Sequence, residues 1–600
     1  MRLFCCDSCE ELQRLKYICD MDYAVATNKY EFYQMIKEKE KVCCFLESFE
    51  INPHEIVWNI LDRINEVINR WKAIEYSRIF HFSYHIEGGF ASKISQMIVN
   101  LNLIDDIVKK YDIKEIYIFD NKHNWVINES IYLYAEANKI QCHIFAEEDK
   151  TQKYILKTLE RMGKTTTDIV EKEYLIEEGK RIDGYSRKSR STFQNNTVER
   201  QKIGALYCCK RTYDKQVKWL LKKISVIEEN VRVICYWDMD DVKKMIDSGL
   251  EVDCLENYFV WDDFIKAYKE MQSDRRQLLQ LMKKELVITY LGIDLSEFFI
   301  LKISNFYYRE LLDHLYMKVC AHRYFVFHKF KHILMWGNAN FWETWISYDV
   351  TREEHTRFFM IDTNGFITPK MKIPYWNITD VAFIPPGKCE QYKQEYPGEV
   401  VIIRDLIWGE YDEKEEKKIN SSGKKIAVLP TGILGGFTTH FFYYNTLIPL
   451  IEKLIDKGNE VVLKNHPGIN NCWEEEVRLK FANNTKFEML DADFPVSEVI
   501  EQSSVVITDI SCVAFDAAVA EKPVLCIVDD EGYLQIYHRE KGFQIFRDVN
   551  KLINELEQVL YDKNEYLSVV EKQKRYMSQI TGKSDIDMKG LMRKTLFALE

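Results

Sequence analysis

The chain has 600 residues, of which 46% are hydrophobic and 29% charged, and its formal net charge is −12. A chain of this length exceeds one hydrophobic core, so we expect roughly three domains. The negative charge argues against a dedicated nucleic-acid-binding protein, which needs clustered Lys and Arg for phosphate contacts. No apolar run reaches the roughly 18 residues of a membrane span and no signal peptide is recognisable, so we expect a cytoplasmic protein.

Sixteen cysteines are present, and many of them lie in apolar segments that read as strands, such as Cys208, Cys209 and Cys526. In a cytoplasmic protein this placement indicates reduced, buried thiols rather than disulfides. Cys6 and Cys9 form a CxxC pair, but no second pair or His follows at zinc spacing. We therefore expect no metal site.

The first 150 residues read as a helical segment followed by a small α/β domain. Residues 1–75 are rich in aromatic side chains and poor in glycine, and we expect helices there. From residue 78 to about residue 146 the pattern is βαβαβ, with a strand predicted at 78–85. The pair Gly88-Gly89 follows that strand, and a tight turn is favoured over an anion site because the full GxGxxG spacing is absent.

Residues 151–201 are polar and read as a helical linker. The basic cluster from Arg187 to Arg190 has two interpretations. We favour a solvated linker, and the alternative is peripheral contact with acidic lipids at the inner face of the plasma membrane. Residues 202–408 form a second α/β series. Its strands are predicted at 203–209, 231–237, 298–304, 332–338, 357–365, 380–387 and 400–405.

A charged segment at 409–422 reads as a second linker, and residues 423–600 form the last α/β domain. Short apolar strands alternate there with helices, which is typical of a parallel sheet covered on both faces. Ligands of such sheets bind at the carboxyl ends of the strands. This rule indicates four places: the turn with Thr431 and Gly432, the corner at His466, the turn from Thr508 to Ser511, and Asp529-Asp530.

His466 follows a predicted strand and precedes Pro467-Gly468. Proline restrains the preceding backbone to an extended conformation, so we expect the imidazole to project from the strand end. There it would donate to a phosphate oxygen or act as an acid-base group. Lys464, two residues upstream, is expected to add positive charge.

The turn with Thr508, Asp509 and Ser511 precedes a predicted helix, whose first amides would face a nucleotide diphosphate. Simple capping of the helix is the alternative. Asp516 lies seven residues after Asp509 and is expected on the same side, while Tyr533 follows the next strand. The carboxylates of Asp516, Asp529 and Asp530 either bind ligand hydroxyls or are solvated, and the sequence favours neither alternative.

The motifs LPTG, NHPG and TDIS, followed by FD, KP and DDEGY in residues 423–533, resemble the carboxyl-terminal half of the CDP-glycerol glycerophosphotransferases. These are teichoic-acid and capsule polymerases of the GT-B fold. The resemblance implies that His466 is the phosphate-binding and catalytic histidine. The other matching positions are Pro430-Thr431, Thr508-Asp509, Ser511, Phe515-Asp516, Lys522-Pro523, and Asp529 or Asp530 with Tyr533.

Two positions depart from the family pattern. Cys512 stands where the family has a second Ser, and Asn364-Gly365 stands where it has a His-Gly whose histidine is the proposed base. Because asparagine does not accept a proton, either Asp362, our candidate, or another residue is the base, or the enzyme performs different chemistry, such as sugar transfer with a carboxylate base.

The resemblance implies a GT-B-like pair of Rossmann-like domains facing a cleft, here preceded by an additional N-terminal α/β domain. Residues 202–408 would be the acceptor side and 423–600 the donor side. We expect a transferase of cell-surface polysaccharide synthesis that uses a nucleotide-diphosphate-linked donor and a glycan or lipid-linked acceptor, with no further cofactor and no nucleic acid. The alternatives are a glycosyltransferase using a nucleotide sugar and a non-catalytic scaffold.

Overall fold

The architecture consists of three parallel sheets with the same strand order around the first strand of each. The computed structural model describes residues 1–18, 22–46, 54–70, 82–120, 125–146, 203–206, 231–235, 247, 251–328, 330, 332–336, 356–361, 380–389, 392–393, 396–404, 425–432, 440–466, 473–509, 511–528, 542–582 and 594–595. In each sheet the first strand lies between the second and the fourth. Each sheet is therefore Rossmann-like, and the expected α/β class with a pair of such domains after an N-terminal one is confirmed.

The N-terminal sheet is covered by helices on both faces. Its order is β3 (Cys43–Phe45), β2 (Tyr23–Thr27), β1 (Arg2–Cys5), β4 (Glu115–Asp120) and β5 (Gln141–Ala146). One face packs on α1 (Cys9–Ile18) and α2 (Tyr30–Ile36). The other face packs on α3 (His54–Asn69), α5 (Phe82–Tyr111) and α6 (Trp125–Ala137).

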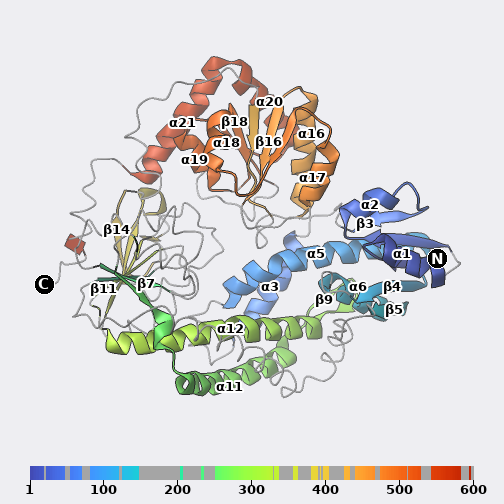
Figure 1. Ribbon diagram of the computed structural model, residues 1–600, viewed down its shortest axis with the longest axis horizontal. Helices are drawn as coiled ribbons and strands as arrows, with labels where there is room; N and C mark the ends of the chain where they lie inside the picture. Colours follow the sequence, from blue (N-terminus) through green and yellow to red (C-terminus); the bar gives the residue numbers. More distant parts are fainter. Residues whose placement is uncertain are drawn as a thin grey trace.

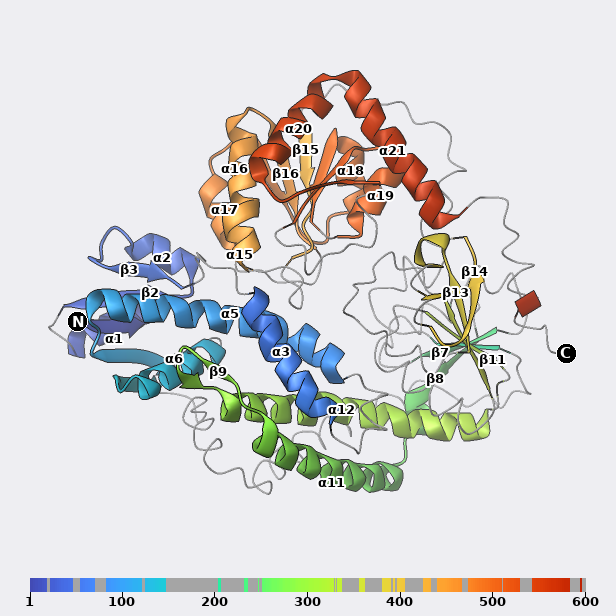
Figure 2. The same ribbon diagram turned by 180° about the vertical axis from the view of Figure 1, so that it is seen from behind.

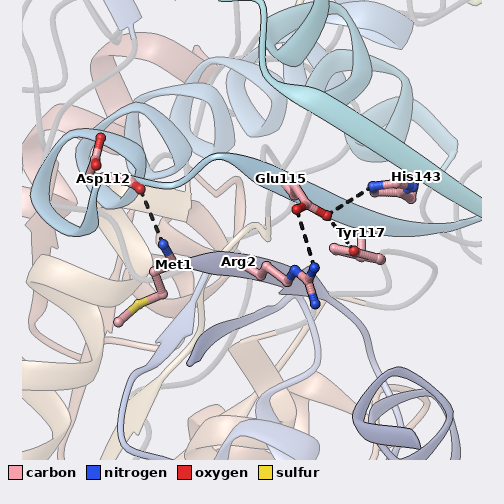
Figure 3. Close-up of polar contacts among 6 residues, drawn as sticks. All are labelled: Met1, Arg2, Asp112, Glu115, Tyr117 and His143. Carbon is pink, nitrogen blue, oxygen red and sulfur yellow. Dashed lines mark hydrogen bonds and ion pairs between the residues drawn. The ribbon is translucent and has the colours of Figure 1, made fainter. Parts of the chain in front are cut away.

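Polar contacts join β1, β4 and β5 at the amino end of this sheet (Figure 3). Glu115 of β4 lies 3.3 Å from Arg2 of β1, and it accepts a hydrogen bond of 2.6 Å from the Tyr117 hydroxyl. His143 of β5 contacts the same carboxylate at 3.2 Å. The hydrogen bond from Tyr117, followed by Arg2, lowers the pKa of Glu115. The cluster thus ties three strands together at the edge opposite to the ligand-binding edge of such sheets.

Two expectations for this region are wrong. The first 45 residues contain β1, β2 and β3, whereas the sequence indicated a helix-rich segment without strands. Residues 82–85, expected in a strand, begin α5, so Gly88-Gly89 lies inside a helix and not in a turn. Strands of three to five residues carry little periodicity, and a short apolar run does not distinguish a strand from a buried helix.

The middle sheet has seven parallel strands. Their order is β14 (Glu399–Ile402), β13 (Val381–Ile384), β12 (Arg357–Ile361), β11 (His332–Trp336), β6 (Ile203–Leu206), β7 (Val231–Cys235) and β8 (Glu251–Cys254). The sequence predicted these strands except β8. Between β8 and β11 come the short helix η2 (Leu255–Tyr258), the long helices α11 (Trp261–Glu285) and α12 (Ser296–Phe327), and the small antiparallel pair β9 (Thr289–Tyr290) and β10 (Ile293–Asp294).

Helix α12 joins the middle and N-terminal domains into one core. Residues 298–304 were expected to form a strand, but they lie in α12, where Phe298, Phe299 and Ile303 are buried. A helix that packs on several sides is apolar on several sides, so its sequence lacks the 3.6-residue alternation of apolar and polar positions that identifies a helix. The buried Lys302 of α12 pairs with the buried Glu129 of α6. Figure 1 shows α11 and α12 running beneath both domains.

The C-terminal sheet has the order β17 (Phe487–Leu490), β16 (Glu460–Lys464), β15 (Lys425–Val428), β18 (Val505–Thr508), β19 (Val524–Ile527) and β20 (Gln544–Phe546). The strand order reverses between β15 and β18. The helices are α15 (His440–Phe442), the π-helical turn η6 (Tyr443–Leu447), α16 (Ile448–Asp456), α17 (Trp473–Phe481), α18 (Val496–Gln502), α19 (Val513–Val519), α20 (Val549–Tyr561) and α21 (Lys563–Thr581).

The last helix, α21, reaches back to the middle domain, as both Figure 1 and Figure 2 show. It packs against η4 (Pro386–Lys388). Gly387 lies so close to Ile580 that a Cβ atom there would be 2.7 Å from the Ile580 Cβ. Among the described residues, no helix combines the length and the apolarity that crossing a membrane requires.

Candidate functional site

The candidate site is centred on the buried carboxylate of Asp509, which directly follows β18. It accepts hydrogen bonds from the Thr431 amide at 2.9 and 3.0 Å, from the Thr431 hydroxyl, and from the Ser511 amide at 3.0 Å. The Tyr443 hydroxyl lies 3.3 Å away. One side chain therefore holds the turn after β15 against the end of β18, across the reversal of the strand order.

Burial raises the pKa of Asp509, and the hydrogen bonds from Thr431, Ser511 and Tyr443 act in the opposite direction. A buried carboxylate is costly unless donors compensate for the lost water. Four donor groups from three separate segments meet here. The folded chain therefore depends on this carboxylate for the shape of the strand edge.

Thr508 and Lys464 also turn their polar groups inward. The Thr508 hydroxyl donates to the carbonyl of Leu429 at 2.6 Å. The Lys464 ammonium group donates to the carbonyls of Asn465 at 3.1 Å and Ala492 at 2.9 Å, and this residue is only 5% exposed. These bonds hold the strand ends in place, and the expectation that both residues bind a ligand stays a prediction.

Gly432 occupies a backbone conformation that only glycine adopts readily, with φ of +90°. Its amide donates a 2.6 Å hydrogen bond to the Tyr443 hydroxyl. The Tyr443 ring stacks on Trp473, with ring centroids 4.6 Å apart. Sequence reasoning missed Tyr443 and Trp473. Tyr443 lies in a π-helical turn, which shifts the helical register that hydrophobic periodicity indicates.

Backbone amides at the start of α19 already have hydrogen-bond acceptors within the preceding turn. The Val513 amide donates to the Ser511 hydroxyl at 3.3 Å, and the Ala514 amide donates to the Ser511 carbonyl. With the Ser511 amide bound to Asp509, the expectation of unpaired amides fails for these three groups. Asp516 is exposed while Asp509 is buried, so the two carboxylates do not share one environment.

His466 is exposed at the carboxyl end of β16, next to β15 in the sheet. The structure therefore brings His466 to the same strand edge as Thr431, Gly432 and Asp509. Asp362 and Tyr533 lie outside the described residues, as do Asn364, Asp529-Asp530 and the basic cluster at 187–190. Their roles stay predictions.

In the part of the chain that the structure describes, no three His, Cys, Asp or Glu side chains gather in a way that would hold a metal ion. Cys6 is buried and Cys9 is exposed. His466 is exposed at this strand edge, and its imidazole can donate to a phosphate oxygen.

A family model described as CDP-glycerol:poly(glycerophosphate) glycerophosphotransferase matches residues 436–585. The resemblance seen in the sequence is confirmed. The matched segment contains His466, Asp509 and Tyr443, and it identifies the C-terminal domain as that of a transferase. A search of curated proteins found no match.

Several solved structures are similar to this chain at low identity. UDP-GlcNAc 2-epimerase from Neisseria meningitidis bound to UDP-GlcNAc has a TM-score of 0.42 and 11% identity, over 66% of this chain and 100% of its own. Anabaena HepE in complex with UDP and glucose has a TM-score of 0.40 and 9% identity, over 66% and 100%. Acinetobacter baumannii MurG has a TM-score of 0.37 and 8% identity, over 66% and 99%. We infer no substrate from likenesses of this size.

Proposed function

We propose that this protein transfers a glycerol phosphate unit from a nucleotide-diphosphate-linked donor, with CDP-glycerol as the leading candidate, to a hydroxyl of a glycan or lipid-linked acceptor. The reaction would take place in the cytoplasm or at the inner face of the plasma membrane and would serve cell-surface polysaccharide synthesis. The observation that carries the proposal is that the family match falls on the domain whose strand edge holds His466 beside the turn braced by Asp509.

In the proposed reaction, the acceptor hydroxyl oxygen forms a bond to the donor's β-phosphorus. The bond from that phosphorus to the bridging oxygen breaks, and the nucleoside monophosphate leaves. The hydroxyl proton passes to a base, for which Asp362 is the candidate. His466 donates to the pyrophosphate as its leaving charge grows, a contribution that typically changes the rate by about 100-fold or more.

Asp509, Thr508 and Lys464 act in this proposal as positioning residues, because their polar atoms bond within the domain. Thr431 and Gly432 present the turn that the donor contacts. Ser511 and Asp516, at and within the start of α19, remain candidates for donor contacts through their side chains.

The test is a thermal-shift screen of the purified chain with CDP-glycerol, CMP, CDP, UDP, GDP and nucleotide sugars, followed by an assay of CMP release. A ligand at 100 times its Kd stabilises the fold by about 2.7 kcal/mol. We expect cytidine ligands to stabilise the chain, and His466→Ala to lower CMP release by about 100-fold. His322→Ala is the matched control, since His322 is exposed on α12.

Each outcome separates the alternatives. Stabilisation by uridine or guanosine nucleotides would indicate a glycosyltransferase that uses a nucleotide sugar. Nucleotide binding without product from any acceptor would indicate a non-catalytic scaffold. Equal CMP release by His466→Ala and the unmodified chain would contradict the proposed site.

A further inference from the structure

The N-terminal domain touches the C-terminal domain beside the candidate donor site. Helix α2 packs against α17, and both Figure 1 and Figure 2 show α2 and β3 next to the lower end of the C-terminal domain. Phe45 of β3 meets Tyr444 of η6 edge-to-face, with ring centroids 5.9 Å apart. Tyr33 of α2 stacks on Phe45 at 5.7 Å. An aromatic group of one domain thus rests on a single turn of the other.

That turn presents two adjacent tyrosines to different partners. Tyr443 reaches the Gly432 amide at 2.6 Å and Asp509 at 3.3 Å, inside the candidate site. Tyr444 contacts Phe45 of the N-terminal domain. Because the two residues are neighbours in one hydrogen-bonded helical turn, a displacement of one backbone displaces the other. π-Helical turns are rare and occur frequently at functional sites.

Helix α17 makes a second link between the same two places. Its first residue, Trp473, is fully buried and stacks on Tyr443. One turn later, Glu476 lies near Tyr33 of α2. The Glu476 Oε2 atom and the Trp473 indole nitrogen are buried and have no hydrogen-bond partner among the described residues. Helix α17 thus contacts Tyr443 through Trp473 and the N-terminal domain through α2.

We propose that the N-terminal domain regulates donor binding, by resting on Tyr444 and α17 and so fixing Tyr443 and the turn formed by Thr431 and Gly432. The N-terminal domain is then a built-in effector of the C-terminal domain. The inference about affinity rests on the proposed nucleotide site, whereas the inference about the turn's rigidity does not. The physical connection is short, since Tyr443 and Tyr444 are consecutive residues.

The first experiment measures amide hydrogen exchange of the full chain without any ligand. In Phe45→Ala we expect the amides of Thr431 and Gly432, which bond to Asp509 and Tyr443, to exchange about fivefold or more faster. Phe145→Ala is the matched control. It removes an aromatic ring from the same N-terminal sheet, where Phe145 contacts Tyr117 and Phe119.

The second experiment measures the Kd for CMP. We expect Phe45→Ala to weaken CMP binding about fivefold or more, within the usual range of coupling between sites. Combined with Tyr443→Phe, the effects should be non-additive, because both changes act on the same turn. If Phe45→Ala does not fold, Tyr444→Ala removes the same contact from the C-terminal side.

Unchanged exchange at Thr431 and Gly432 in both Phe45→Ala and Tyr444→Ala would overturn the inference. Equal acceleration in Phe145→Ala would also overturn it, since general loosening of the N-terminal domain would then suffice. An unmodified chain that binds no nucleotide would overturn the proposed function, while the exchange data would still decide whether the N-terminal domain fixes the turn.

Discussion

The N-terminal and C-terminal sheets share their strand order around the first strand, and each has a buried aspartate at its carboxyl edge, but the two aspartates join different strands. Asp7 follows β1 and accepts from the Thr27 hydroxyl at 2.7 Å and the Asn28 amide at 2.9 Å, both at the end of β2. Asp509 follows the fourth strand of its sheet and accepts from Thr431 after the first. Only Asp509 spans the place where the strand order reverses.

The turn after β1 in the N-terminal sheet also differs from the turn after β15 in the C-terminal sheet. In the N-terminal domain, the Glu11 amide donates to the Ser8 hydroxyl at 3.1 Å and the Asp7 amide donates to the Glu11 carboxylate at 2.6 Å. This arrangement resembles a capping box, although the amide bound by Glu11 is one residue before the N-cap, and it closes the turn on its own helix. In the C-terminal domain, Gly432 continues the turn towards Tyr443. A shared topology therefore does not imply a shared site, since the side chains at the reversal decide what the edge presents.

The largest effect is expected for Asp509→Ala. Removing an acceptor of four donor groups from a buried site should lower the free energy of unfolding by about 3 kcal/mol and abolish CMP binding. Chemical denaturation and calorimetric titration measure the two effects. Asp456→Ala is the control, because Asp456 is exposed at the last position of α16, away from this strand edge. A fully stable Asp509→Ala variant would show that the bridge between the strands is dispensable.

Asp7→Ala sharpens the comparison. It removes an acceptor of two donors, so we expect a loss of about 2 kcal/mol in the free energy of unfolding. CMP affinity should stay within about twofold of the unmodified chain, because this carboxylate does not brace the donor turn. If Asp7→Ala abolished CMP binding as Asp509→Ala does, the distinction between the two aspartates would be lost.

A smaller effect is expected for Gly432→Ala. A Cβ atom at a φ of +90° should cost about 1 kcal/mol of stability and also displace the turn. Gly458, with φ of +89° after α16, is the matched control, since Gly458→Ala carries similar strain away from the strand edge. The melting temperature should fall by a similar amount in both variants, whereas the affinity for CMP should fall only in Gly432→Ala.

The last prediction concerns pH. Burial raises the pKa of Glu476 from 4.5 to about 7, while Lys480 on the same helix opposes the shift and Tyr33 faces it from α2. The folded state thus keeps a proton that the unfolded state releases, so this contribution to stability is present below pH 4.5 and is lost as pH rises through about 7. Glu476→Gln should reduce the fall in melting temperature between pH 4.5 and about 7. If the melting temperature of this variant fell as steeply as that of the unmodified chain, other groups would cause the loss of stability.

The sequence predicted the C-terminal domain well because its strands and helices alternate clearly and its motifs fall on strand ends. It placed Thr431, His466 and Asp509 at one edge, where the structure has them. It did not predict that Asp509 binds Thr431, since that contact joins residues 78 positions apart. Tyr443 was missed because of the π-helical turn, and α12 because a helix packed on several sides shows no clear period.

The buried pair of Glu129 and Lys302 has a consequence for any attempt to shorten the chain. A protein beginning after the N-terminal domain would lack Glu129, the partner of Lys302, and would expose apolar residues of α12 that this domain covers. The chain should therefore resist dissection: truncated products should precipitate, and natural variation at position 129 should be matched at position 302.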